Sequence, residues 1–115
     1  MQSAVLVLNA DAARAQALVS KLKAVSANAL VVRSLHELQQ VAAELGIRLG
    51  VVDLDLATLQ EIISLQRRLS MEIVCTHHTA DESMWADVMN AGALDYCFDD
   101  DVAAICRALA HAKAA

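Results

Sequence analysis

GALDYCFDDD, residues 92–101, is the stretch from which the fold can be worked out. A mostly apolar run at 94–98 passes directly into three aspartates, with no glycine or proline between them. A continuous run of this kind, without alternation of apolar and polar residues, is typical of a strand that is covered on both faces. We therefore predict a buried strand that ends in an acidic turn, where Asp100 or Asp101 caps the next helix.

The same arrangement repeats along the whole chain. Apolar runs without alternation lie at residues 4–8, 29–32, 49–54, 72–76 and 94–98. The segments between them carry apolar residues at helical spacing, and Ser34 and Thr58 each begin a capping box with a glutamate three residues later. Strand–helix units of this size predict an α/β fold: a five-stranded parallel sheet with helices on both faces, in a single domain spanning 1–115.

Composition and charge narrow the classes of function. The chain has 115 residues, of which 57% are hydrophobic and 20% charged, which is enough for one hydrophobic core. The net charge is -5 and most acidic residues lie in 51–115, so we expect no direct nucleic-acid partner. Nothing reads as a signal peptide or a membrane span, so we expect a cytoplasmic protein with no membrane partner and with reduced cysteines.

The carboxyl ends of parallel strands meet at one edge of a sheet, where such folds place their functional groups. The residues at the predicted strand ends are largely acidic or hydrogen-bonding, and they are Asn9, Ala10, Asp11, Arg33, Ser34, Asp53, Asp55, Thr76, His77, His78, Asp99, Asp100 and Asp101. We therefore expect Asp53, Asp55 and Asp99 to share one acidic rim.

Three segments resemble the receiver domain of bacterial response regulators. They are VVDLDLA (51–57), IVCTHHTADE (73–82) and AGALDYCFDDD (91–101), each followed by a predicted helix. The resemblance covers nearly the whole chain in order, and AGALDY is its most specific part. It implies a flavodoxin-like fold with strand order 2-1-3-4-5, and a role in two-component signalling in which an aspartate accepts a phosphoryl group.

The resemblance also implies roles for single residues. Asp53 matches the phosphoacceptor, and Asp55 matches the position whose backbone carbonyl helps to hold Mg²⁺. Thr76 matches the hydroxyl residue that contacts the phosphoryl group, and Tyr96 matches the aromatic residue whose rotamer follows that hydroxyl.

Other positions depart from the receiver pattern. Where receivers carry the acidic pair that holds the metal ion, this chain has Asn9 and Ala10. Asp99 stands in place of a lysine, and Asp100 in place of a proline. Phosphorylation of an aspartate adds close to two negative charges, which Mg²⁺ and the lysine offset. Because two unit charges about 4 Å apart interact by roughly 4 kcal/mol at an effective dielectric of about 20, repulsion at position 99 works strongly against transfer.

His77 and His78 are the other candidate ligands at this rim. With Asp53, Asp55 or Asp99 they have the donor types that bind Zn²⁺ or another transition metal. Neighbouring residues of an extended strand point to opposite faces, so one ion would bind both only if the chain turns there. We predict two polar loop residues instead, no cofactor, and at most weak binding of Mg²⁺ through Asp53, the Asp55 carbonyl and Asp99.

Trp85 and Met89 lie four residues apart on a predicted helix, offset from the residues expected to face the core. Tryptophan and methionine are enriched at interfaces. The resemblance adds that receivers commonly bind partners through the fourth helix, the fifth strand and the fifth helix. We therefore predict a partner surface at Trp85, Met89 and Tyr96, with packing at the edge of the core as the alternative.

The sequence thus favours a regulatory interaction module, a degenerate receiver or pseudo-receiver that is not an enzyme. We expect its partner to be a protein: a histidine kinase, an output domain or a second copy of the chain. The alternative is a working phosphoacceptor that is phosphorylated on Asp53 in a phosphorelay, which the retained Asp53, Thr76 and Tyr96 favour.

Overall fold

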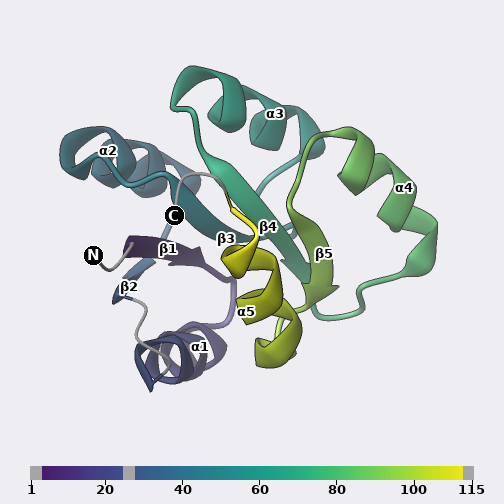
Figure 1. Cartoon of the computed structure of the whole chain (residues 1–115), viewed down its shortest axis with the longest axis horizontal. Helices are drawn as coiled ribbons and strands as arrows, with labels where there is room; N and C mark the ends of the chain where they lie inside the picture. The colour runs from purple at the N-terminus through teal and green to yellow at the C-terminus, as the bar shows by residue number, and fades with distance from the viewer. Residues whose placement is uncertain (1–3, 25–27, 113–115) are drawn as a thin grey trace.

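Strands and helices alternate along the chain, as the sequence predicts. The computed structural model describes residues 4–24 and 28–112 (Figure 1). The strands are β1 (Ala4–Leu8), β2 (Asn28–Val32), β3 (Leu49–Asp53), β4 (Glu72–His77) and β5 (Asp95–Phe98). The helices are α1 (Ala12–Ala24), α2 (Leu35–Leu45), α3 (Leu59–Arg68), α4 (Glu82–Asn90) and α5 (Val102–Ala110). Within these described ranges, no helix is both long and apolar enough to span a membrane.

The strands form one parallel sheet in the order β2-β1-β3-β4-β5. The predicted fold class and strand order are therefore confirmed. The chain leaves β1 toward β2 on one side and later returns to place β3 on the other side of β1. Such a reversal opens a crevice beside the carboxyl ends of the two strands that flank it, here β1 and β3.

Helices cover both faces of the sheet (Figure 1). Alternate residues of β1 show how the core is divided: Val5 and Val7 pack with α1 and α5, while Leu6 and Leu8 pack with α2, α3 and α4. Because both faces are covered, successive residues of β1, β3 and β4 are almost all buried, which explains their continuous apolar runs. The edge strands β2 and β5 are partly exposed, so the prediction of a buried strand at 94–98 is wrong except at Cys97.

Helices α2, α3 and α5 begin where the sequence indicates. Ser34 and Thr58 each accept a hydrogen bond from the backbone N–H three residues later, and the Glu61 carboxylate accepts one from the Thr58 N–H. Gly46 ends α2 with a left-handed φ of 66°. Asp101 caps α5, so the predicted role of the acidic turn after β5 is confirmed for that residue.

Candidate functional site

Buried polar side chains mark the carboxyl edge of the sheet. Within residues 4–24 and 28–112, the polar or charged side chains that are buried are Asp53, Thr76 and Asp99, at 2%, 1% and 4% exposed. Asp53 ends β3 and is paired in register with Thr76 of β4, and Asp99 directly follows β5. Burial of a carboxylate is costly unless its oxygens are hydrogen-bonded or paired with a cation. The partners of these carboxylates therefore define the site.

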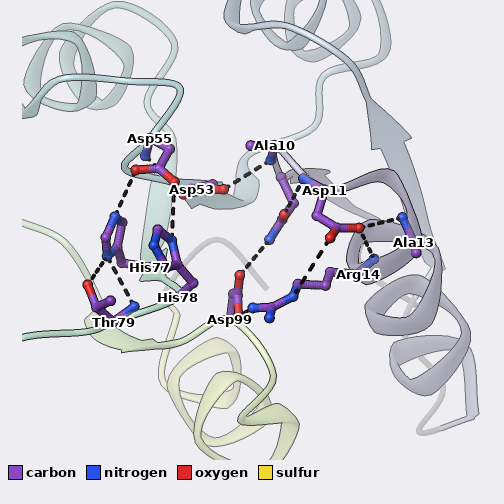
Figure 2. Close-up of polar contacts among 11 residues, drawn as sticks. Ala10, Asp11, Ala13, Arg14, Asp53, Asp55, His77, His78, Thr79 and Asp99 are labelled. Carbon is purple, nitrogen blue, oxygen red and sulfur yellow. Dashed lines mark hydrogen bonds and ion pairs between the residues drawn. The ribbon is translucent and has the colours of Figure 1, made fainter.

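Two backbone N–H groups hold the Asp53 carboxylate. Its Oδ2 accepts a hydrogen bond from the N–H of Ala10 at 3.0 Å, and its Oδ1 accepts one from the N–H of Asp55 at 2.9 Å (Figure 2). Ala10 lies in the turn between β1 and α1, and it has no side-chain ligand for a metal ion. It contributes to the site by hydrogen-bonding the carboxylate instead.

Asn9 links the ends of β1 and β5. Its Nδ2 donates a hydrogen bond to Oδ2 of Asp99 at 3.2 Å, and its Oδ1 accepts one from the N–H of Asp11 at 2.8 Å. Asp11 in turn begins α1, because its Oδ1 accepts a bond from the N–H of Ala13 at 2.9 Å. Both ends of the Asn9 amide are thus engaged with protein groups, at a position where the resemblance implies a metal-binding carboxylate.

Arg14 is a site residue that sequence reasoning missed. Its Nη1 lies 2.7 Å from Oδ1 of Asp99, and its Nε lies 4.0 Å from Oδ2 of Asp11 (Figure 2). A guanidinium therefore offsets the charge of the Asp99 carboxylate, which the sequence analysis did not take into account, and the repulsion expected there against transfer stays a prediction. A signal was present in the sequence: Arg14 lies in the first turn of a helix, where the helix dipole disfavours a cation that lacks an acidic partner.

Asp55 contacts both histidines of the rim. Nε2 of His77 lies 2.8 Å from one carboxylate oxygen, and Nδ1 of His78 lies 3.2 Å from the other. The two imidazole rings lie side by side, with their centroids 4.2 Å apart. The turn that the sequence analysis required for both histidines to face one ion is present, because β4 ends at His77 and the chain bends at His78.

Thr76 and Tyr96 occupy the positions that the resemblance assigns to a conformational switch. Thr76 lies beside Asp53 in the sheet, and Tyr96 is paired in register with Cys75. The pKa of the Tyr96 phenol is raised, mainly by burial. Asp81 acts on this pKa in two opposite ways: a hydrogen bond with its backbone lowers it, and the negative charge of its side chain raises it. The phenol therefore lies near Asp81, which caps α4.

The acidic rim encloses a cleft of about 210 Å³. The cleft is lined by Asn9, Ala10, Asp11, Arg14, Asp53, Asp55, His78 and Asp99. The structure thus brings together the predicted phosphoacceptor position and the predicted degenerate positions. Thr76 and Tyr96 are not among the lining residues, although Thr76 lies directly beside Asp53.

A groove of about 220 Å³ lies between α4, β5 and α5. It is lined by Ala80, Asp81, Glu82, Trp85, Asp95, Tyr96, Cys97, Phe98, Asp101 and Ala104. Trp85 and Phe98 are 52% and 48% exposed, and within α4 only Val88 is buried. Two of the predicted partner residues, Trp85 and Tyr96, line this groove, whereas Met89 does not.

The cysteines are free, as expected, and two of them lie in the sheet. Burial raises the pKa of the Cys75 thiol to about 12, and burial together with the neighbouring Asp95 raises the pKa of the Cys97 thiol to about 12. A thiol with such a pKa stays protonated at neutral pH, and only the thiolate is a nucleophile. These two cysteines therefore have packing roles.

Solved structures of receiver domains share this fold. A response regulator from Thermotoga maritima has a TM-score of 0.84 at 16% identity, over 96% of this chain and 99% of that one. A response regulator receiver protein from Pseudomonas putida has a TM-score of 0.82 at 21% identity, over 97% and 98%. The BeF3-activated receiver domain of RstA from Klebsiella pneumoniae has a TM-score of 0.81 at 15% identity, over 95% and 97%. No protein-family model matches the chain, and no curated protein matches it.

The chain therefore has the receiver-domain fold. The resemblance that three sequence segments suggested is confirmed at the level of the fold, along the whole length that those structures cover. Because one fold supports many functions, the chemistry has to be argued from the residues of the site.

Proposed function

We propose that this protein is a signalling module that acts by binding another protein, and that its receiver site accepts a phosphoryl group on Asp53 poorly. The observation that carries the proposal is the network of Asn9, Asp99 and Arg14. The first two of these residues stand where the resemblance implies a metal ligand and a lysine, and here they are hydrogen-bonded to each other. Arg14 engages the same Asp99 carboxylate. The module acts through binding, and not as an enzyme.

The chemistry of phosphoryl transfer supports this proposal. Transfer to Asp53 needs a cation to offset the charge on the transferred group. Both ends of the Asn9 amide bond protein groups, and Ala10 offers an N–H but no side-chain oxygen. Mg²⁺ demands near-octahedral oxygen coordination, so Asp53 and the Asp55 carbonyl would hold it only weakly. We therefore assign the phosphoacceptor position at Asp53 no resident cofactor beyond weakly bound Mg²⁺.

A working phosphoacceptor is the second candidate function, and Asp53 itself favours it. The carboxylate is 2% exposed, and Thr76 lies beside it in register. Arg14 already places a cation at the rim, and it would approach a phosphoryl group if it released Asp99. On this reading a histidine kinase supplies the phosphoryl group within a phosphorelay.

Incubation with Mg²⁺ and acetyl phosphate, followed by measurement of intact mass, separates the two candidates. We expect the wild-type protein to gain no more phosphoryl adduct than Asp53→Asn, because the charge on the group would lack its metal ion. Strong labelling of the wild type that Asp53→Asn removes would refute the impaired site and establish the phosphoacceptor.

Rebuilt variants test whether missing charges are the cause. Asn9→Asp and Ala10→Asp restore the carboxylate pair, and Asp99→Lys restores the cation. A lysine at position 99 would face the Arg14 guanidinium, which now lies 2.7 Å from Asp99, so we add Arg14→Ala as a fourth change. We expect Asp99→Lys alone to stay inert and the quadruple variant to be labelled. If the quadruple variant folds but is still not labelled, loop geometry and not the missing charges explains why the site is not phosphorylated.

The groove at Trp85 and Tyr96 is the proposed partner surface. Large exposed apolar side chains in a groove are typical of binding hot spots. The occupant is a histidine kinase, an output domain or a second copy of the chain, and self-association is measured first by sedimentation equilibrium. We expect Trp85→Ala to weaken association by about tenfold. Leu45→Ala, at a residue of α2 that is 62% exposed, is the matched control and should change nothing.

A further inference from the structure

We propose that Asp55, His77 and His78 form a binding site for a divalent transition-metal ion such as Zn²⁺. The cluster offers one carboxylate oxygen and two imidazole nitrogens, all within 4.8 Å of one another. Figure 2 shows both rings turned toward the Asp55 carboxylate. A set of two histidines and one carboxylate is a known donor set for zinc with an open position.

The distances between donor atoms suit an ion placed between them. In a tetrahedral site with ligand bonds of about 2.0–2.1 Å, two donor atoms lie about 3.3 Å apart. Here Oδ1 of Asp55 lies 2.8 Å from Nε2 of His77, and Oδ2 lies 3.2 Å from Nδ1 of His78. An ion therefore requires the side chains to separate by a few tenths of an ångström. The Asp55 and His78 side chains are 42% and 50% exposed, so solvent leaves them room to rotate.

Thr79 holds the ring of His77 in the orientation that coordination needs. The Thr79 Oγ1 lies 2.7 Å from Nδ1 of the ring, and the Thr79 N–H approaches the same nitrogen at 3.2 Å. Nε2 is thereby left facing Asp55. In the structure Nδ1 accepts a hydrogen bond from the Thr79 N–H. When Nε2 coordinates an ion, the proton lies on Nδ1 instead, so the Thr79 N–H gives up this bond. Nδ1 then donates a hydrogen bond to Oγ1, which is the outer contact that metal-binding histidines usually make.

The donor types and the surroundings favour a transition metal over Mg²⁺ or Ca²⁺. Imidazole nitrogens suit zinc, copper and nickel, whereas Mg²⁺ and Ca²⁺ prefer oxygen ligands. Asp53 lies next to the cluster, since its Oδ1 accepts a hydrogen bond from the Asp55 N–H, and its negative charge also attracts a cation. Because His78 lines the open cleft, an ion has a path to the site.

The backbone after the histidines is strained. Ala80 has a φ of 25°, in the left-handed half of the Ramachandran map that residues other than glycine rarely adopt. Strain of this kind gathers at ligand sites, where surrounding contacts maintain it. The strained residue directly follows Thr79, whose side chain contacts the His77 ring.

Calorimetric titration of the untagged chain with ZnCl₂ tests the proposal. We expect one ion to bind per chain, and excess Mg²⁺ not to compete, whatever the state of Asp53. His77→Gln and His78→Gln should each weaken binding by about tenfold or more, because each removes a ligand. His36→Gln, which changes an exposed histidine on α2, is the matched control and should bind as the wild type does.

Nitrogen-15 spectra of the imidazoles add a direct readout. Zn²⁺ should shift the ring resonances of His77 and His78 and leave those of His36 and His111 in place. The proposal is overturned if the folded wild type binds no Zn²⁺ at about 1 mM, or if His78→Gln binds as tightly as the wild type. His78 is exposed, so its variant keeps the test valid even where His77→Gln fails to fold.

Discussion

Replacement of Arg14 by methionine should destabilise the protein, because it leaves a buried carboxylate without its cation. Asp99 is 4% exposed, and Nη1 of Arg14 lies 2.7 Å from its Oδ1. Methionine keeps an unbranched side chain with a helix propensity close to that of arginine. The substitution therefore removes the charge and the hydrogen bond and leaves α1 otherwise unchanged.

The expected loss in the free energy of unfolding is about 2 kcal/mol, between two limits. Removal of one partner from a buried ion pair costs roughly 3–5 kcal/mol, whereas an exposed pair contributes roughly 0–1 kcal/mol. Here the carboxylate is buried, but the Arg14 side chain is 46% exposed and Asn9 still donates to Asp99. For a domain of this size, a loss of about 2 kcal/mol lowers Tm by about 8 °C.

Urea denaturation followed by far-UV circular dichroism measures the loss in a double-mutant cycle. Asp99→Asn should cost less, about 1 kcal/mol, because Arg14 can then turn into solvent. The coupling between the two changes should be about 1.5 kcal/mol. Asp100→Asn, at the exposed neighbour, is the control and should stay within about 0.5 kcal/mol of the wild type. If Arg14→Met costs no more than that control and the coupling is zero, the pair is solvated and the network reasoning fails.

Backbone geometry, thiol burial and helix capping each lead to a further expected outcome. Ser70 has a φ of 53°, which glycine adopts more easily, so Ser70→Gly should raise the free energy of unfolding by about 0.5–1 kcal/mol in thermal melts. Ser64→Gly, inside α3, is the control and should lower the free energy of unfolding. A change of the same sign at both positions would show that the backbone at Ser70 is not strained. The pKa values of Cys75 and Cys97 rise from 9.0 to about 12 on folding. The folded state therefore keeps these thiols protonated, and the contribution of this difference to the free energy of unfolding is complete below about pH 9 and is lost as the pH rises toward 12. At pH 8 these thiols should react with a disulfide reagent about a thousandfold more slowly than in urea, and equal rates would refute their burial. Thr58→Ala should lower the free energy of unfolding, measured by urea denaturation, by about 1 kcal/mol. An unchanged free energy would mean that the capping box contributes nothing to stability.

The fold could be predicted because several levels of the sequence indicate the same elements. The run predicted at 94–98 is the strand Asp95–Phe98, and the capping boxes begin helices where expected. Continuous apolar runs indicate strands that are buried on both faces, and parallel pairing of such strands limits the architectures that remain. The strand order itself came from the resemblance, since no local pattern specifies which strands are neighbours.

The composition of the rim could also be predicted, but the partners of its residues could not. Parallel strands end together, and this alone places Asn9, Asp53 and Asp99 at one edge. The partnership of Arg14 with Asp99 depends on how α1 is rotated about its own axis. The convergence of His77 and His78 depends on the bend after β4. Both are products of packing in three dimensions, and residue spacing does not encode them.

The Arg14–Asp99 pair changes the meaning of the charge reversal at position 99. A carboxylate in place of a lysine would by itself leave a buried negative charge beside Asp53, at considerable electrostatic cost. Arg14 offsets that charge from α1, and Asn9 donates to the remaining oxygen, so the reversal belongs to a set of mutually supporting contacts. Groups coupled in this way do not respond additively to substitution. A lysine introduced alone would face a guanidinium and release the Asn9 amide, so it would lose stability before it restored any chemistry.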